Sequence, residues 1–143
     1  MITIRHLLDS KGYEIWSILP NSTVYEALVL LAQMDIGALL VKDNDKVVGI
    51  FSERDYARKI ILHGKSSKET LVREVMTHEV ISMSPDQTIE ECMKVMTNNR
   101  IRHIPVQHDD EVIGVVSIGD VVNAIISNQE FMIEQLENYI QGS

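Results

Sequence analysis

One seven-residue pattern occurs twice in this chain, and the distance between its copies is the strongest constraint on the fold. Residues 49–55 read GIFSERD and residues 114–120 read GVVSIGD, so both follow Gly-x-x-Ser-x-x-Asp. A shift of 65 residues superposes the two copies without insertion. The same shift aligns further identical residues at 14 and 79, 17 and 82, 23 and 88, 26 and 91, 36 and 101, 41 and 106, 45 and 110, and 47 and 112. The chain is therefore predicted to contain two copies of one folding unit.

Each copy predicts the same order of secondary structure. Short apolar stretches at 14–19 and 79–83 favour a strand, and Thr-x-x-Glu from Thr23 and from Thr88 is a capping box that opens a helix. Two β-rich runs follow in each copy, joined by the polar turns DNDK and HDDE, which predicts a hairpin. Ser52 and Ser117 then open a second helix. We expect an α/β (α+β) fold made of two strand–helix–strand–strand–helix repeats.

The repeats suggest boundaries along the chain. We expect residues 1–65 to form the first repeat with an N-terminal extension, residues 66–126 to form the second, and residues 127–143 to form a C-terminal amphipathic helix. The polar stretch HGKSSKET at 63–70 is the predicted joint. Apolar residues in the tail have the spacing of a helix that packs on the body or on a partner subunit; they are Phe131, Ile133, Leu136, Tyr139 and Ile140.

Composition narrows the classes of partner. The 143 residues carry a net charge of −8, and nucleic-acid binding needs a sustained positive face. No stretch is long and apolar enough for a membrane span, and the first ten residues lack the apolar core of a secretory signal. Cys92 is the single cysteine and aligns with Ala27, so we expect a small buried residue in a reducing compartment. These features predict a cytoplasmic protein that binds neither nucleic acid nor membranes.

The tandem repeat resembles a pair of CBS domains, or Bateman module, of the free-standing type. The resemblance covers residues 14–126 and is carried by RIRHIPV at 100–106, GVVSIGDVV at 114–122, and GIFSERDYARKI at 49–60 followed by GKSS at 64–67. It implies a disc-shaped module whose repeats pack sheet to sheet about a pseudo-twofold axis. It also implies two clefts between the repeats, where family members commonly bind AMP, ADP, ATP, NAD or S-adenosylmethionine.

Asp55 and Asp120 close the two copies of the pattern and admit two interpretations. In Ser-x-x-Asp the carboxylate can simply complete a capping box at the positive end of a helix. A carboxylate at such a place can also accept hydrogen bonds from a ribose diol, as acidic residues do in other nucleotide sites. The resemblance favours the ribose role, and the two roles are compatible because Ser52 and Ser117 can cap the helices.

Arg102 and His103 occur only in the second copy, where they align with Gly37 and Ala38. They can be solvated residues at a helix end. A phosphate needs local cations, however, and RIRH is one of the two densest basic stretches of an acidic chain. The resemblance implies that Arg102 and His103 meet phosphate near Asp120, with His103 gaining charge as the pH falls toward about 6.5. Arg54 would serve the weaker Asp55 site.

The remaining candidate residues line the same expected sites. Apolar positions there are more often plain core, but they can also form the wall of an adenine slot. The full set of expected ligand-binding residues is Trp16, Ser17, Ile36, Gly37, Ser52, Arg54, Asp55, Ile81, Ile101, Arg102, His103, Pro105, Ser117, Gly119 and Asp120. Trp16 and Ser17 are expected beside the Asp120 site.

The chain is thus expected to be a regulatory module that binds an adenosine-containing ligand, most simply AMP, and modulates an effector protein. The alternative is a scaffolding pair that acts through protein contacts without nucleotide. No catalytic constellation and no metal-ligand spacing is found among the histidines and Cys92, so neither enzyme activity nor a metal is expected. A homodimer is expected through apolar helix surface at Met34, Met93, Met96, Phe131 and Leu136.

Overall fold

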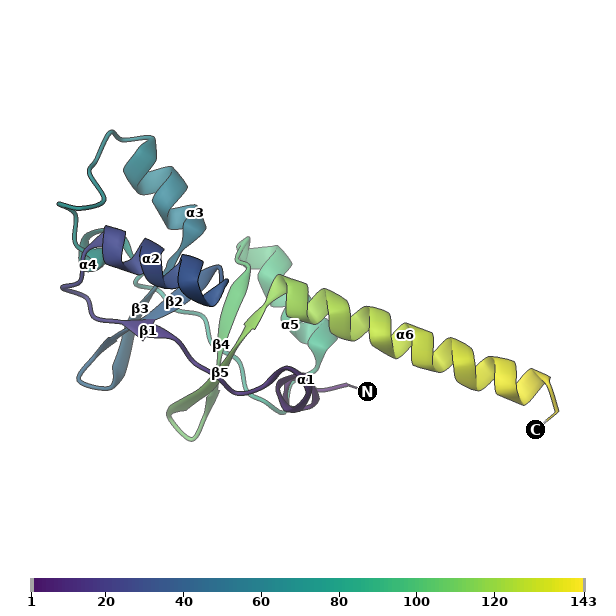
Figure 1. Cartoon of the computed structure of the whole chain (residues 1–143). Helices are drawn as coiled ribbons and strands as arrows, with labels where there is room; N and C mark the ends of the chain where they lie inside the picture. Colours follow the sequence, from purple (N-terminus) through teal and green to yellow (C-terminus); the bar gives the residue numbers. More distant parts are fainter. Residues whose placement is uncertain (1, 143) are drawn as a thin grey trace. The chain divides into compact units, whose positions relative to one another are not determined.

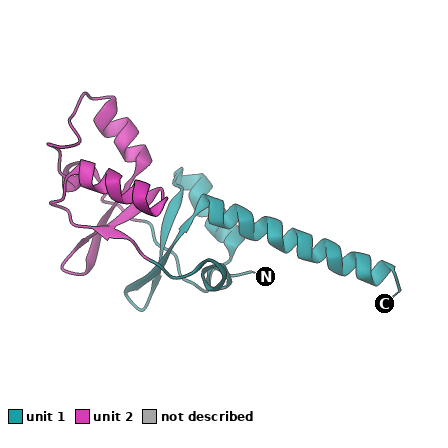
Figure 2. Ribbon diagram, in the orientation of Figure 1, with its two compact units in different colours: residues 1–14, 81–143 teal, residues 15–80 magenta. Residues whose placement is uncertain are grey.

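The computed structural model describes residues 2–142 and consists of two compact units (Figure 2). Unit 2 is one continuous stretch, residues 15–80. Unit 1 is assembled from two stretches, residues 1–14 and 81–143. Each unit contains one copy of the repeated pattern together with a short helix that lies outside that repeat in the sequence.

Unit 2 is built on a three-stranded sheet in the order β1-β2-β3, with β1 parallel to β2 and β2 antiparallel to β3 (Figure 1). Its elements are β1 (Ser17–Ile18), α2 (Val24–Met34), β2 (Ala38–Asp43), β3 (Lys46–Ser52), α3 (Glu53–Asp55), the π-helix η1 (Tyr56–Ile61) and α4 (Val72–Val75). The second helix of the first repeat is therefore a single α-turn that widens into a π-helix.

Unit 1 contains the antiparallel sheet β4-β5 and the longest helix of the chain. Its elements are α1 (Ile4–Lys11), α5 (Ile89–Asn99), β4 (His103–His108), β5 (Glu111–Ser117) and α6 (Ile118–Ile140). The last helix of the second repeat and the expected tail helix are one continuous element, because no proline or glycine interrupts residues 120–140.

The predicted helices and hairpins follow in the expected order in both repeats, and the two hairpins share one register. Ala38 pairs with Ser52 as His103 pairs with Ser117, and each hairpin shifts register after Val41 or Val106. The polar turns contain pairs of residues with positive φ, at 44 and 45 and at 109 and 110, as tight hairpin turns require.

The first predicted strand is shorter than expected in both copies, and in unit 1 it is reduced to a single parallel bridge between Met83 and Val106. Pro105 explains that difference. In unit 2 the equivalent Leu40 donates its backbone N–H to the carbonyl of Trp16 at 3.1 Å. Proline has no N–H to donate, so the matching bond cannot form and the strand ends.

Each repeat is completed by a helix that precedes the other repeat in the chain. α1 packs on α5 and α6 in unit 1, and α4 packs on β3 and η1 in unit 2. The attachment is the same in both: Ile4 N–H donates to Gln87 O and Val72 N–H donates to Ser22 O, each at 2.8 Å. Unit 1 is therefore discontinuous in sequence. The linear boundaries at 65 and 126 describe the order of the repeats and stay a prediction.

This packing explains the glycine of the repeated pattern. A Cβ on Gly114 would lie 2.8 Å from Leu8 Cδ2, and a Cβ on Gly49 would lie 2.6 Å from Met76 Sδ. Leu8 belongs to α1, and Met76 directly follows α4. The strand must lack a side chain where the added helix crosses it.

Two apolar cores fill the units. Cys92 is buried in the unit 1 core, as expected, and burial raises the pKa of its thiol to about 11. Met96 is also in that core and is 1% exposed, so its predicted place on a dimer surface is wrong. It fills space between α5 and the sheet because its position on α5 continues the buried stripe of Ile89 and Cys92.

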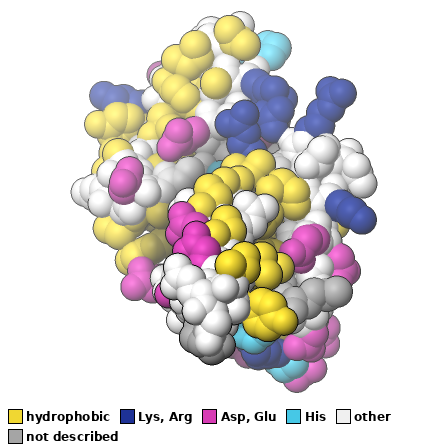
Figure 3. All heavy atoms as spheres, turned by 90° about the vertical axis from the view of Figure 1, so that its right-hand side faces the viewer, with side chains coloured by type: hydrophobic (Ala, Val, Ile, Leu, Met, Phe, Trp, Pro, Cys, Tyr) yellow, Lys and Arg dark blue, Asp and Glu magenta, His cyan; other side chains and the backbone are white. Residues whose placement is uncertain are grey.

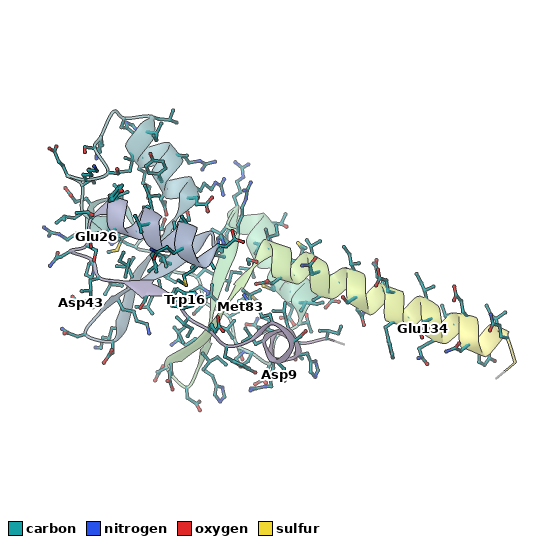
Figure 4. The ribbon with its side chains drawn as sticks, in the orientation of Figure 1. Asp9, Trp16, Glu26, Asp43, Met83 and Glu134 are labelled. Atoms are coloured by element: carbon teal, nitrogen blue, oxygen red, sulfur yellow. The ribbon has the colours of Figure 1, made fainter. Side chains whose placement is uncertain are left out.

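The distal part of α6, marked by Glu134 in Figure 4, leaves large apolar side chains exposed. They are Ile126, Phe131, Met132, Ile133, Leu136, Tyr139 and Ile140. Figure 3, in which α6 points toward the viewer, shows hydrophobic side chains gathered near the centre with acidic ones beside them. Within residues 2–142, no helix has the length and apolarity to cross a membrane.

Candidate functional site

The start of the second helix in each repeat is a reciprocal capping box. Ser117 N–H donates to Asp120 Oδ2 at 2.9 Å, and Asp120 N–H donates to Ser117 Oγ at 3.1 Å. Ser52 and Asp55 form the same pair of bonds, at 2.9 and 3.2 Å. The capping interpretation of Ser-x-x-Asp is confirmed in both copies, while the ribose interpretation stays a prediction.

The backbone brings the expected site residues of each repeat to the same end of its hairpin. In unit 1 the N–H of Ile118 donates to Arg102 O at 2.8 Å, and His103 pairs with Ser117. Arg102, His103, Ser117, Gly119 and Asp120 therefore gather around the N-terminus of α6.

Unit 2 repeats this arrangement around the N-terminus of α3. The N–H of Glu53 donates to Gly37 O at 3.1 Å, and Ala38 pairs with Ser52. Gly37, Ser52, Arg54 and Asp55 are gathered there in the same way. Because Gly37 and Ala38 carry no charge, the cations that unit 1 places at the strand start have no counterpart at this strand start in unit 2.

Asp55 is held by several groups of its own unit. Its carboxylate accepts from the hydroxyl of Thr77 at 3.2 Å, and Lys59 Nζ lies 3.1 Å from Oδ1. Lys59 is one turn along the same helical segment and also donates to the carbonyl of Val75 at 2.8 Å. Asp55 is 9% exposed, so this carboxylate is largely enclosed.

Asp120 is more open and has a different cationic partner. Lys11 Nζ, at the end of α1, lies 2.5 Å from Asp120 Oδ2 and donates to the carbonyl of Val115 at 2.9 Å. Burial alone would raise the pKa of Asp120, but the hydrogen bonds from Lys11 and Ser117 outweigh it and hold the pKa below its ordinary value. The Asp120 side chain is 24% exposed.

Sequence reasoning missed Lys11. It lies 109 residues from Asp120, and the repeat shift does not pair it with Lys59, which acts on the other aspartate. From the sequence, the N-terminal stretch was expected only as an extension of the first repeat, and no helix was predicted there. Its place beside Asp120 depends on α1 packing against the second repeat.

His103 is half-buried at the start of β4, and its environment corrects one expectation. Burial lowers the pKa of His103, Lys11 and Arg102 lower it further, and Asp120 opposes them. The ring therefore gains its charge at a lower pH than an ordinary histidine does. The expectation that His103 gains charge as the pH falls toward about 6.5 did not include this burial, and a contact between His103 and phosphate stays a prediction.

The apolar residues that were expected to bind ligand are partly or fully buried. Ile36 and Ile101 are partly buried and pack against the cores of their own units. Pro105 is buried within β4, and Ile81 is partly buried just before the Met83 bridge. These residues can form apolar walls, and that role stays a prediction.

Trp16 and Ser17 lie at β1 in unit 2, where Ser17 pairs with Leu40. The Trp16 side chain is exposed (Figure 4), so it has surface to offer a ligand. Their expected position beside the Asp120 site stays a prediction. Within residues 2–142, no group of three or more His, Cys, Asp or Glu side chains is arranged to hold a metal ion.

Known proteins share both the sequence and the fold. The model of the CBS domain family matches residues 4–62 and 72–127. The mitochondrial CBS domain-containing protein CBSX3 of Arabidopsis thaliana is 42% identical over 98% of this chain and 72% of its own length.

Among solved structures, a CBS-domain protein from Burkholderia ambifaria is 45% identical with a TM-score of 0.87, covering 89% of this chain and 96% of its own. A CBS-domain protein from Agrobacterium tumefaciens is 36% identical with a TM-score of 0.82, covering 85% and 92%. Proteins of this kind are generally regulatory, ligand-binding modules. With two matched domains and relatives along nearly its whole length, the chain belongs to the CBS-domain family.

Proposed function

We propose that this protein is a non-catalytic sensor that binds an adenosine-containing ligand at the Asp120 site of unit 1 and modulates a separate effector protein in the cytoplasm. The observation that carries the proposal is the gathering of a partly exposed carboxylate with Arg102 and His103 at the N-terminus of α6. AMP is the first candidate because it combines a ribose diol with a single phosphate. NAD, ADP, ATP and S-adenosylmethionine share the adenosine part.

Each part of such a ligand has a partner of matching chemistry in this site. The Asp120 carboxylate can accept from the ribose hydroxyls, and charge-assisted hydrogen bonds of this kind are about twice as strong as neutral ones. The exposed guanidinium of Arg102 can bind a phosphate in two places at once. The positive end of the α6 dipole favours a negative group at the same position. Ile101 and Pro105 supply an apolar wall for the base.

The Asp55 site is a weaker candidate for the same chemistry. Arg54 lies two residues after the Ser52 cap and brings a cation to the start of α3. The Asp55 carboxylate, however, is largely enclosed and already accepts hydrogen bonds from Ser52, Thr77 and Lys59. A ribose would have to replace more bonds here than at Asp120.

Calorimetry with adenosine, AMP, ADP, ATP, NAD and S-adenosylmethionine tests the proposal directly. We expect one or more of these ligands to bind the wild type and to raise its melting temperature, since a ligand that binds only the folded state stabilises it. Asp120→Ala should weaken binding at least about tenfold, because it removes charge-assisted hydrogen bonds.

Glu134→Ala is the matched control, because it removes a carboxylate from the exposed distal part of the same helix (Figure 4). It should leave the affinity unchanged. A wild type that binds none of the six ligands, or equal binding by Asp120→Ala, would overturn the proposal and favour the scaffolding alternative.

The surface of α6 supports a homodimer as the second part of the proposal. Val122, Ile126, Ile133, Leu136 and Ile140 are exposed and are spaced by four, seven, three and four residues, which we call the α6 seam. This spacing repeats every seven residues, as in helices that pair with copies of themselves. Phe131 lies on the opposite side of α6 at about 100° per residue, so it is not part of the seam.

Sedimentation of Ile133→Glu and Phe131→Glu tests this arrangement. A charge buried in a self-pairing seam should shift the protein from dimer to monomer, while the same charge at Phe131 should not. A wild type that sediments as a monomer of 16.2 kDa would contradict the dimer.

A further inference from the structure

The ion pair between Lys11 and Asp120 occupies the atom that a bound ribose would need. Lys11 Nζ lies 2.5 Å from Asp120 Oδ2, the same oxygen that accepts from the Ser117 N–H. A diol that binds both oxygens of the carboxylate must share or displace the ammonium. The structure therefore places a cation where the ribose is expected.

The pair is easily exchanged. The side chain of Lys11 is 36% exposed and that of Asp120 is 24% exposed, so water competes for both groups. An ammonium has three donors on a flexible stem, and one of them already reaches the carbonyl of Val115 at 2.9 Å. Lys11 can keep that bond while it changes its second partner.

The surroundings give the ammonium room to move. A cavity of about 360 Å³ lies between α1 and α6 and is lined at one end by Lys11 and Asp120. The other lining groups include His6, Ser10 and Asn123, which are polar and exposed. A cavity of this size is within the range of small-ligand pockets.

We propose that Lys11 is an exchangeable cation of the Asp120 site: it neutralises Asp120 when the site is empty and transfers to the phosphate of a nucleotide when the ribose takes the carboxylate. The inference rests on the proposed function and adds a source of specificity to it. Adenosine must break the ion pair and offers the Lys11 ammonium no new anionic partner. A nucleotide offers its phosphate to Lys11 in place of the Asp120 carboxylate. The site therefore discriminates between a nucleotide and adenosine.

Lys11→Met separates this role from simple support of the fold. The change keeps most of the length of the side chain and removes its charge. We expect AMP to bind about tenfold more weakly, which corresponds to about 1.4 kcal/mol. Adenosine should bind about two- to fivefold more tightly, because the Lys11 ammonium no longer competes with it for Asp120. The gain is small because the ion pair is partly exposed and of modest strength. Lys11→Arg should retain the preference for AMP.

Lys94→Met is the control, since it removes an exposed lysine from α5 in the same unit. It should leave both affinities unchanged. The exchange would be overturned if Lys11→Met changed the affinities for AMP and adenosine equally, in either direction. It would also be overturned if neither affinity changed. The proposed function would then stand without it. A wild type that binds neither ligand would overturn both.

A measurement on the wild type keeps the inference testable if Lys11→Met does not fold. The NMR signals of the Lys11 side chain should respond to AMP differently from adenosine, since only AMP gives the ammonium a new anionic partner. Identical responses to the two ligands would contradict the exchange.

Discussion

Asp55 and Asp120 occupy the same place in the repeated pattern and make the same capping box, yet their surroundings differ. The side chain of Asp55 is 11% exposed and is bound by Ser52, Lys59 and Thr77, all from unit 2. The side chain of Asp120 is 24% exposed and is bound by Ser117 and by Lys11, which comes from the opposite end of the chain. Both aspartates have a lysine partner, but the two lysines are not equivalent by the repeat.

The comparison shows that one motif is held by different partners in the two units. The Asp55 carboxylate binds Lys59, one turn further along the same helical segment, and also accepts a hydrogen bond from Thr77. Asp55 therefore links different parts of unit 2. Asp120 has fewer partners, more exposure and two additional basic residues beside it, Arg102 and His103. Duplication of a sequence motif therefore does not give two equal sites.

The largest expected effect is a difference in stability between the two alanine variants. Asp55→Ala should lower the free energy of unfolding by about 3 kcal/mol, because it leaves Lys59 and Thr77 without an enclosed partner. Asp120→Ala should lower it by only about 1 kcal/mol, since water can replace the carboxylate. Urea unfolding at pH 7 measures both. Equal losses would mean that Asp120 is as structural as Asp55.

Substitution of the two pattern glycines should give the next largest loss of stability, and the loss should be similar in the two units. Gly49→Ala and Gly114→Ala each force a Cβ against the helix that completes the unit, Met76 in one and Leu8 in the other. Overpacking of this kind costs about 1–3 kcal/mol. Gly119→Ala is the control, because its Cβ would meet only Ser117 Oγ at 3.7 Å. Unfolding midpoints that do not change in Gly114→Ala would contradict the close packing of α1.

The cations at the strand start should matter for phosphate and not for the nucleoside. Arg102→Ala should weaken AMP about tenfold and leave adenosine unchanged, because adenosine has no phosphate to lose. Arg54→Ala, at the Asp55 site, should have a smaller effect on the total AMP binding. Calorimetric titration with both ligands measures the difference. If both ligands weaken equally in Arg102→Ala, the arginine supports the fold and does not bind phosphate.

The smallest expected effect is a dependence of stability on pH that arises from His103 in unit 1. The pKa of His103 is lowered in the folded protein by burial, then by Lys11 and Arg102, against Asp120. The unfolded chain binds the proton first, so stability is complete above about pH 6.5 and falls as the pH drops below it.

Between pH 7.5 and 5.5 the loss due to His103 can be at most about 1.4 kcal/mol, and Ala38 in the equivalent place contributes none. His103→Gln should reduce the loss, whereas His78→Gln, at an exposed position, should not. Urea midpoints at the two pH values test this. An undiminished loss in His103→Gln would assign the pH dependence to other groups.

Much of each repeat could be predicted from local sequence. The Thr and Ser caps, the polar turns with positive φ and the alternating strands act over a few residues, so their physics is visible in the chain itself. The shift of 65 residues then predicted that the hairpins and helix starts would correspond, and their registers do. Arg102, His103 and Asp120 were brought together by these same local rules, across one hairpin.

Other features depended on contacts that no local rule contains. The attachment of α1 to the second repeat made Lys11 the partner of Asp120, and it gave Gly114 its reason to be glycine. Met96 was expected on a dimer surface and is buried, on the same stripe of α5 as Ile89 and Cys92. The sequence by itself determined the two repeats and their caps. Only the tertiary structure decided which lysine meets which aspartate, because a side chain that is 109 positions away in sequence becomes a neighbour only when its helix packs there.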